Sequence, residues 1–162
     1  MRDSLGGTVM FVIIIIFLVV ALGYLAYSVN YTKAFRMNDK IISLYNEFNG
    51  ECTSDIKPGY EQSCQEQIEK YANEIGYVAA DLECNKFSND ATVLKYKNLF
   101  CAIPRVESNA SEIEGDTKGK MHYQIITKIN IQVPIISNIF HFEIGYIERN
   151  TKPIECTDKC KE

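Results

Sequence analysis

Residues Gly6–Phe35 read GGTVMFVIIIIFLVVALGYLAYSVNYTKAF, and this stretch decides the fold of the 162-residue chain. It belongs to a run of 29 residues without a charged side chain. Its apolar part, Val9–Val29, supplies the roughly 20 residues that a helix needs to cross a bilayer core. A cleaved signal peptide has a shorter apolar region, of roughly 7–15 residues. The sequence therefore predicts an uncleaved anchor that crosses the cell membrane once.

The span divides the chain into three expected parts. These are a short polar leader at residues 1–7, the transmembrane helix at residues 8–29 and one extracytoplasmic α+β domain at residues 30–162. Tyr24, Tyr27 and Tyr31 follow at helical spacing on one face, as the residues of an interfacial aromatic belt do. The domain is long enough to bury a core of its own.

Two signals disagree about the side of the membrane that holds this domain. The basic residues Lys33, Arg36 and Lys40 outnumber Arg2 and the amino terminus, and the positive-inside rule then favours a cytoplasmic domain. Against this stand six cysteines, at positions 52, 64, 84, 101, 156 and 160. They include no C-x-x-C pair and are accompanied by only two histidines, so they do not form a zinc pattern. An even set in a small domain indicates an oxidising compartment, and we place the domain outside the cytoplasm on that ground.

Helical periodicity continues beyond the span. Apolar residues recur every three or four positions in a stripe with one polar member. The members are Phe35, Asn38, Ile42, Tyr45 and Phe48, with Ile41 beside them. No proline interrupts this pattern, and Gly50 is a suitable C-terminal stop. The simplest structure is a single helix from near Thr8 to near Asn49, roughly 60 Å long at 1.5 Å per residue.

A second helix is expected after the turn at Pro58-Gly59, and Gly76 ends it. Its predicted buried face consists of Cys64, Ile68, Tyr71, Ile75 and Val78. A Cys52–Cys64 bridge would join the two helices, and it would contribute about 3 kcal/mol through loop closure. Six cysteines allow 15 connectivities, so this pairing is one of several.

The remaining chain favours strands. Short strands are expected at Val93–Tyr96 and Leu99–Ile103, with Cys84 and Cys101 bridged, followed by a polar loop at residues 105–119. In MHYQIITKINIQV, residues 121–133, apolar and polar side chains alternate, with Ile126 as the exception. The segment FHFEIGY, residues 140–146, repeats the alternation after a turn-forming PIISNI, residues 134–139. The expected fold is α+β: the long helix and the second helix pack on a small antiparallel sheet with a C-terminal β-hairpin.

The sequence holds no catalytic constellation, and we predict neither an enzyme nor a bound cofactor. It contains no nucleophile–base set and no phosphate-binding glycine loop.

The two histidines, His122 and His141, fall on the outward face of their strands. The acidic run of Glu112, Glu114 and Asp116 lacks the spacing and glycine of a calcium loop. Cys156-x-x-x-Cys160 lacks the two-residue spacing of a redox motif and suits a structural tail loop. The net charge of −4 gives no footprint for nucleic acid. The apolar span makes membrane lipid the expected partner.

The N-terminal pattern resembles that of type IV pilins and pseudopilins, and more narrowly that of the TadE-like proteins of tight-adherence systems. In that family a glycine, small residues and Val-Glu-Phe precede an apolar helix. Gly6-Gly7-Thr8-Val9-Met10-Phe11 follows this order, with Met10 where the family has glutamate. The family's glutamate pairs with the free N-terminal amine of a neighbouring subunit, which a methionine cannot do. The resemblance covers about the first 50 residues, and it implies assembly or anchoring roles for Gly7, Thr8, Met10 and Phe11 and a partnership with other pilin-like subunits.

Two functions of different class are consistent with these observations. The first is a structural or assembly subunit whose apolar helix packs against the helices of other copies. The second is a binding module that the span merely tethers outside the cytoplasm. An assembling helix should tolerate few substitutions across Val9–Val20, whereas a tether should accept any apolar segment of sufficient length.

Overall fold

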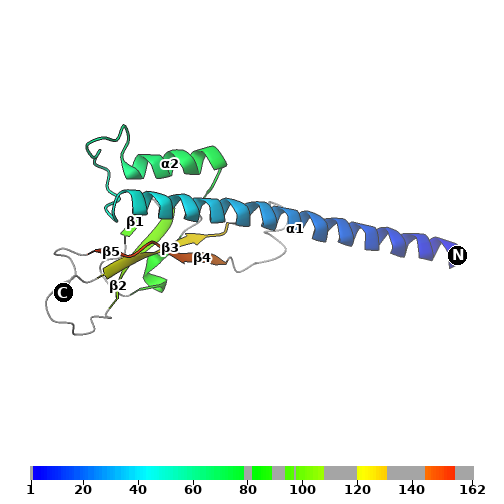
Figure 1. Cartoon of the computed structure of the whole chain (residues 1–162). Coiled ribbons are helices and arrows are strands. Elements are labelled where there is room, and N and C mark those ends of the chain that lie inside the picture. The colour runs from blue at the N-terminus through cyan, green and yellow to red at the C-terminus, as the bar shows by residue number, and fades with distance from the viewer. Residues whose placement is uncertain are drawn as a thin grey trace.

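The computed structural model describes residues 2–78, 82–88, 94–96, 98–107, 120–130 and 145–155. The helices are α1 (Arg2–Glu47) and α2 (Cys64–Ile75), with a 3-10 turn η1 (Cys84–Lys86). The strands are β1 (Leu94–Tyr96), β2 (Phe100–Glu107), β3 (Lys120–Lys128), β4 (Tyr146–Asn150) and β5 (Ile154–Glu155). One half of α1 projects from the domain and the other half runs through it (Figure 1). The predicted α+β class is confirmed.

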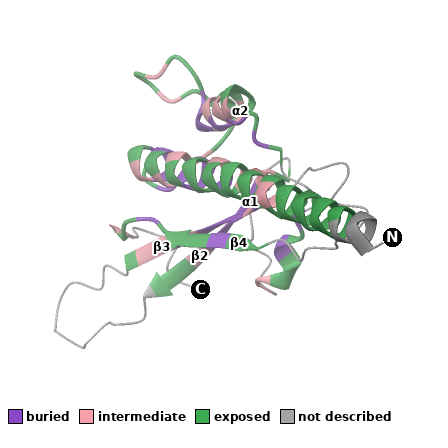
Figure 2. Ribbon diagram, turned by 90° about the vertical axis from the view of Figure 1, so that its right-hand side faces the viewer, coloured by how far each residue is buried: buried purple, intermediate pink, exposed green. Residues whose placement is uncertain are grey.

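The domain has three layers, and α1 is the middle one. In both views α2 lies on one side of α1 and the sheet on the other (Figures 1 and 2). The second helix therefore packs on the side of α1 that faces away from the sheet. This arrangement widens the buried surface of α1 beyond a single stripe: Ala34, Met37 and Leu44 are fully buried along with Asn38 and Ile41. Phe35, which the stripe predicted to be buried, is 38% exposed.

The end of α1 is as predicted. Asn49 and Gly50 both have positive φ, at 53° and 77°, and Gly50 N donates to Tyr45 O at 2.7 Å. A Cβ on Gly50 would lie only 2.7 Å from Cε2 of Tyr123. Both the backbone conformation and the close approach of that ring therefore require glycine here.

Local capping chemistry sets both ends of α2. Ser63 accepts from the backbone N–H of Glu66, and the Glu66 side chain accepts from Ser63 N, which is a complete capping box. Gly76 closes the helix in the left-handed conformation, with φ 61°. Cys64 forms the expected bridge to Cys52. The predicted burial of Val78 is wrong: this residue lies beyond the Gly76 cap, off the helical pattern, and is 53% exposed.

The sheet is antiparallel in the order β1-β2-β3-β4, and β5 pairs with the start of β3. The expected strands at 93–96 and 99–103 correspond to β1 and β2, although β2 extends to Glu107 into the segment predicted as loop. β4, at Tyr146–Asn150, serves as the second strand of the predicted hairpin, and most of the expected strand at 140–146 lies outside the described residues. In its pairing with β3, each pair of opposite residues is centred on position 137 in the sequence, where the sequence predicts the turn. Residues 131–144, including the turn itself, lie outside the described residues.

Both faces of the sheet carry apolar side chains, which explains the Ile126 exception. Tyr123, Ile125 and Ile129 face the main core formed with α1. Ile126 lies directly opposite Cys101 on the other face, in a second buried cluster. The further members of this cluster are Leu82, Cys84 and Ile103, and the Cys84–Cys101 bridge joins η1 to β2 within it.

Ile68 on α2 tests the packing of that helix against α1. Its side chain is fully buried, so Ile68→Ala should lower the free energy of unfolding by about 2–5 kcal/mol. Ile56→Ala, at a side chain that is 59% exposed, is the control and should change it by less than about 0.5 kcal/mol. Urea titration of the detergent-solubilised chain measures both. Equal losses in the two variants would show that α2 does not pack on a core.

Candidate functional site

The candidate site is the projecting part of α1, Gly7–Val29, which we call the stem. Every side chain from Val9 to Val20 is at least 41% exposed, and Figure 2 shows the exposed colour along this half of the helix. Within the described residues, α1 alone has the length and composition to cross a membrane. At 1.5 Å per residue the stem is about 34 Å long, which suits a hydrocarbon core of about 30 Å.

The four residues singled out by the resemblance lie near the tip of the stem. Gly7, Thr8, Met10 and Phe11 are all exposed, and a side chain added at Gly7 would meet no atom within 4 Å. The helix begins at Arg2, so residues 2–7 of the predicted leader continue it without a break at Gly7. These residues therefore lie within little more than one helix turn, and their roles in assembly stay predictions.

An aromatic ladder runs along α1 where the stem meets the domain. The rings of Tyr27 and Tyr31 stack with centroids 6.1 Å apart, and those of Tyr31 and Phe35 at 6.4 Å. The guanidinium of Arg149 from β4 lies 5.1 Å from the centre of the Phe35 ring and pairs with Asp39. A cation over an exposed ring contributes about 0.5–1 kcal/mol, and an exposed ion pair adds up to about 1 kcal/mol. Arg149 therefore joins β4 to the base of the stem.

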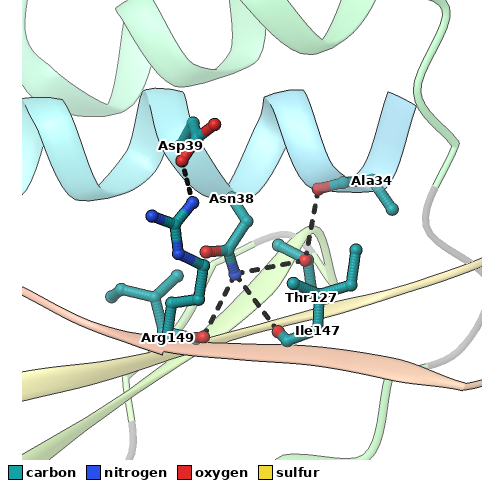
Figure 3. A network of polar contacts seen from close by, with 7 residues as sticks. Ala34, Asn38, Asp39, Thr127, Ile147 and Arg149 are labelled. Atoms are coloured by element: carbon teal, nitrogen blue, oxygen red, sulfur yellow. Dashed lines mark hydrogen bonds and ion pairs between the residues drawn. The ribbon is translucent and has the colours of Figure 1, made fainter. Parts of the chain in front are cut away.

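Asn38 makes the buried connection between α1 and the sheet (Figure 3). Its side chain is fully buried, and Nδ2 donates to the carbonyl oxygens of Ile125 at 3.1 Å and Ile147 at 3.2 Å. The same nitrogen lies 3.3 Å from Oγ1 of Thr127, whose hydroxyl donates to Ala34 O. One amide thus contacts both β3 and β4. Asn38 Oδ1 has no hydrogen-bond partner among the described residues, so this contact also carries a desolvation cost.

A buried tyrosine ties the end of α2 to the sheet. The hydroxyl of Tyr77 donates to Lys128 O at 2.9 Å, with Leu99 O at 3.4 Å. Burial raises the pKa of Tyr77 to about 12, so the phenol is neutral at physiological pH and keeps its proton for this bond. Burial likewise raises the pKa of Tyr45 in the α1 core. These neutral phenols are structural, because each is enclosed by packed elements.

Two hollows on the domain surface are lined by described residues. One, of about 180 Å³, lies near the stem and is lined by Asn30, Lys33, Gly76, Tyr77, Val78 and Asn130. The other, of about 200 Å³, is a more open groove between α1 and α2, lined by Lys40, Gln62, Gln67, Lys70, Tyr71 and Glu74. Across the described ranges, no three His, Cys, Asp or Glu side chains gather in a group that could hold a metal ion.

The structure describes only some of the other residues that the sequence analysis considered as candidate functional groups. His122 lies on β3 and is half-buried. His141, the acidic run at 112–116, and Cys156 and Cys160 lie outside the described residues. The two cysteine pairings expected from the sequence within the described part, Cys52–Cys64 and Cys84–Cys101, are both present.

Sequence reasoning did not find the contacts that attach the stem to the domain. Asn38 carried a signal, because it is the one polar residue in an apolar stripe. Arg149 carried none, since its partners Asp39 and Phe35 are more than a hundred residues away in the chain. Comparisons with protein-family models, with characterised proteins and with solved structures found no match.

Replacement of Asn38 tests the buried connection. Asn38→Ala removes a donor shared by β3 and β4 and leaves buried acceptors without it, so we expect a loss of about 1–3 kcal/mol in the free energy of unfolding. The matched control is Asn73→Ala at an exposed position of α2, which should cost less than about 0.5 kcal/mol. Thermal or urea unfolding measures both variants. A cost for Asn38→Ala no larger than that of the control would contradict this role.

Proposed function

We propose that this chain is a structural or assembly subunit: a pilin-like, membrane-anchored protein of a tight-adherence or type IV filament-type system. In this proposal the stem crosses the cell membrane once and packs against the stems of other copies. The remaining domain is extracytoplasmic and is carried at the membrane surface.

The observation that carries the proposal is the continuity of α1. The helix runs unbroken from Arg2 to Glu47, and its second half forms the middle layer of the domain. Contacts of Asn38 with two strands and of Arg149 with Phe35 and Asp39 fix the domain to this helix. The stem is therefore a rigid extension of the core, and its packing against other stems would set the orientation of every attached domain.

A simple tether has no need of this rigidity. It requires only an apolar segment of sufficient length, and a flexible junction would let a binding domain sample more orientations. In lipid, helices associate through close packing of specific surfaces, because the hydrophobic effect does not drive them together. The exposed surface of the stem, with Phe11 and Phe17 among β-branched residues, offers side chains for such packing.

The disulfides support the extracytoplasmic placement. Two bridges are formed within the described part of a small domain, as is common in oxidising compartments and rare in the cytosol. The basic residues at the base of the stem argue for the opposite orientation, but the difference is only one or two charges. We give the disulfides more weight because several bridged cysteines are a stronger constraint than so small an asymmetry.

Stem-to-stem association is testable in proteoliposomes that contain donor-labelled and acceptor-labelled copies. The wild-type chain should show energy transfer above that of a random distribution at the same density. Replacing Val9–Leu22 entirely with leucine keeps an apolar span but removes its specific surface, and it should abolish that excess transfer while membrane retention stays unchanged. Ile56→Ala, on the exposed surface of the domain, is the control and should leave transfer at the wild-type level.

Two results would overturn the proposal. Association by the polyleucine variant at the wild-type level would show that the stem surface is not recognised. A wild-type chain without excess transfer would favour the tethered binding module instead.

A further inference from the structure

Two elements, α2 and β3, end at the side of the domain from which the stem emerges. β3 runs toward the stem, because Tyr123 packs on Tyr45 while Thr127 contacts Ala34. α2 runs the same way, from the Cys52–Cys64 bridge to Gly76, whose carbonyl accepts from Lys33 Nζ at 3.2 Å. The ends of α2 and β3 meet there, where Asn130 Nδ2 donates to Val78 O at 3.2 Å.

The length of the stem places this end of the domain at the membrane surface. Val9–Val29 fills a hydrocarbon core of about 30 Å, and the headgroup layer adds roughly 5–7 Å on each side. Lys33 lies about 6 Å along the helix beyond Val29 and so reaches headgroup depth. Val78 and Asn130 lie at a similar depth. Lys33 is hydrogen-bonded to Gly76, Val78 follows Gly76 by two residues, and Asn130 is hydrogen-bonded to Val78.

The hollow near the stem has the chemistry of a site for a lipid headgroup. Lys33 is its cation, and none of the ion pairs between described residues includes it. The ammonium has three N–H donors, of which one is directed to Gly76 O, so two remain for an anion. Val78 borders the hollow and is 53% exposed, so its apolar side chain is available for contact with lipid.

We propose that this hollow binds the phosphate of a membrane lipid headgroup. Lys33 pairs with the phosphate, and Val78 lies among the headgroups with its side chain against the boundary of the apolar layer. The domain is then seated on the bilayer by a second contact besides the stem, which limits its tilt. The inference rests on the membrane anchor in the proposed function and is independent of stem-to-stem assembly.

The chain contains no tryptophan, so a single introduced tryptophan reports depth in the membrane without background. We expect Val78→Trp, in phosphatidylcholine vesicles, to emit at shorter wavelength and to be quenched by lipids that carry a nitroxide on the headgroup. Ile56→Trp is the control, because Ile56 is exposed near Cys52 at the opposite end of the domain. It should show neither effect.

The role of Lys33 is tested with Val78→Trp as the reporter and nitroxide-labelled phosphatidylglycerol as the probe. Adding Lys33→Gln should raise the probe fraction needed for half-quenching about fivefold, the effect of one basic residue at a lipid surface. Lys152→Gln makes the same charge change at an exposed position beside Asn46, far from the stem, and should leave half-quenching unchanged. An equal response of the two lysine variants would overturn the assignment of Lys33.

Two further arms separate the possible failures. Millimolar inorganic phosphate should not reverse the quenching, and a reversal would assign the hollow to a soluble phosphate and overturn the lipid proposal. Flotation of the protein with vesicles reports the anchor itself. If the protein floats but Val78→Trp is not quenched, the headgroup site is wrong and the anchor stands. If it does not float, both are wrong.

Discussion

The amide of Asn38 lies in the core between α1 and the sheet, fully buried, and donates to backbone carbonyl oxygens of β3 and β4. A buried amide that loses its hydrogen bonds costs about 1–3 kcal/mol, so this contact disfavours any other register of the helix on the sheet. Because α1 is unbroken, the same contact sets the direction in which the stem leaves the domain. α2 then covers the free side of α1, and the Cys52–Cys64 bridge holds it there.

This constraint connects the fold to the proposed function. A stem that is rigidly continuous with the core transmits orientation between the membrane and the domain, and Arg149 adds a second attachment at its base. The hollow around Lys33 lies at the end of the domain from which the stem emerges. Stem packing and headgroup binding would thus act on one rigid body, and either would restrict how the domain stands on the membrane.

The helices and the central strand could be predicted from the sequence because their periodicity is long and their caps are local. Gly50, the Ser63–Glu66 capping box and Gly76 all act within a few residues. The three-layer order could not be predicted. A helix that is covered on two sides buries residues on more than one face, and the apolar residues in the sequence of α1 do not show that α2 covers its second face.

The errors at Ile126 and Arg149 originate in long-range packing, whereas the error at Val78 is local. Ile126 broke the strand alternation because a second cluster covers the other face of the sheet. The site was only partly predictable: the apolar stem was evident from composition, but the contact of Arg149 with Phe35 joins residues far apart in the chain. The exposure of Val78 follows from the Gly76 cap, which ends the helical pattern before that position.

The central claim is that stem and domain share one continuous helix in the membrane. A distance between spin labels on Val20 and Ser43 tests it most directly, because both positions are exposed and lie on either side of the junction. The labels are introduced as non-canonical amino acids to spare the disulfides, and the protein is diluted with unlabelled copies in proteoliposomes. An unbroken helix gives one narrow distribution near about 35 Å, from a rise of 1.5 Å per residue. A broad distribution, or a dominant shorter distance, would show a bend or hinge at the junction and would contradict the claim.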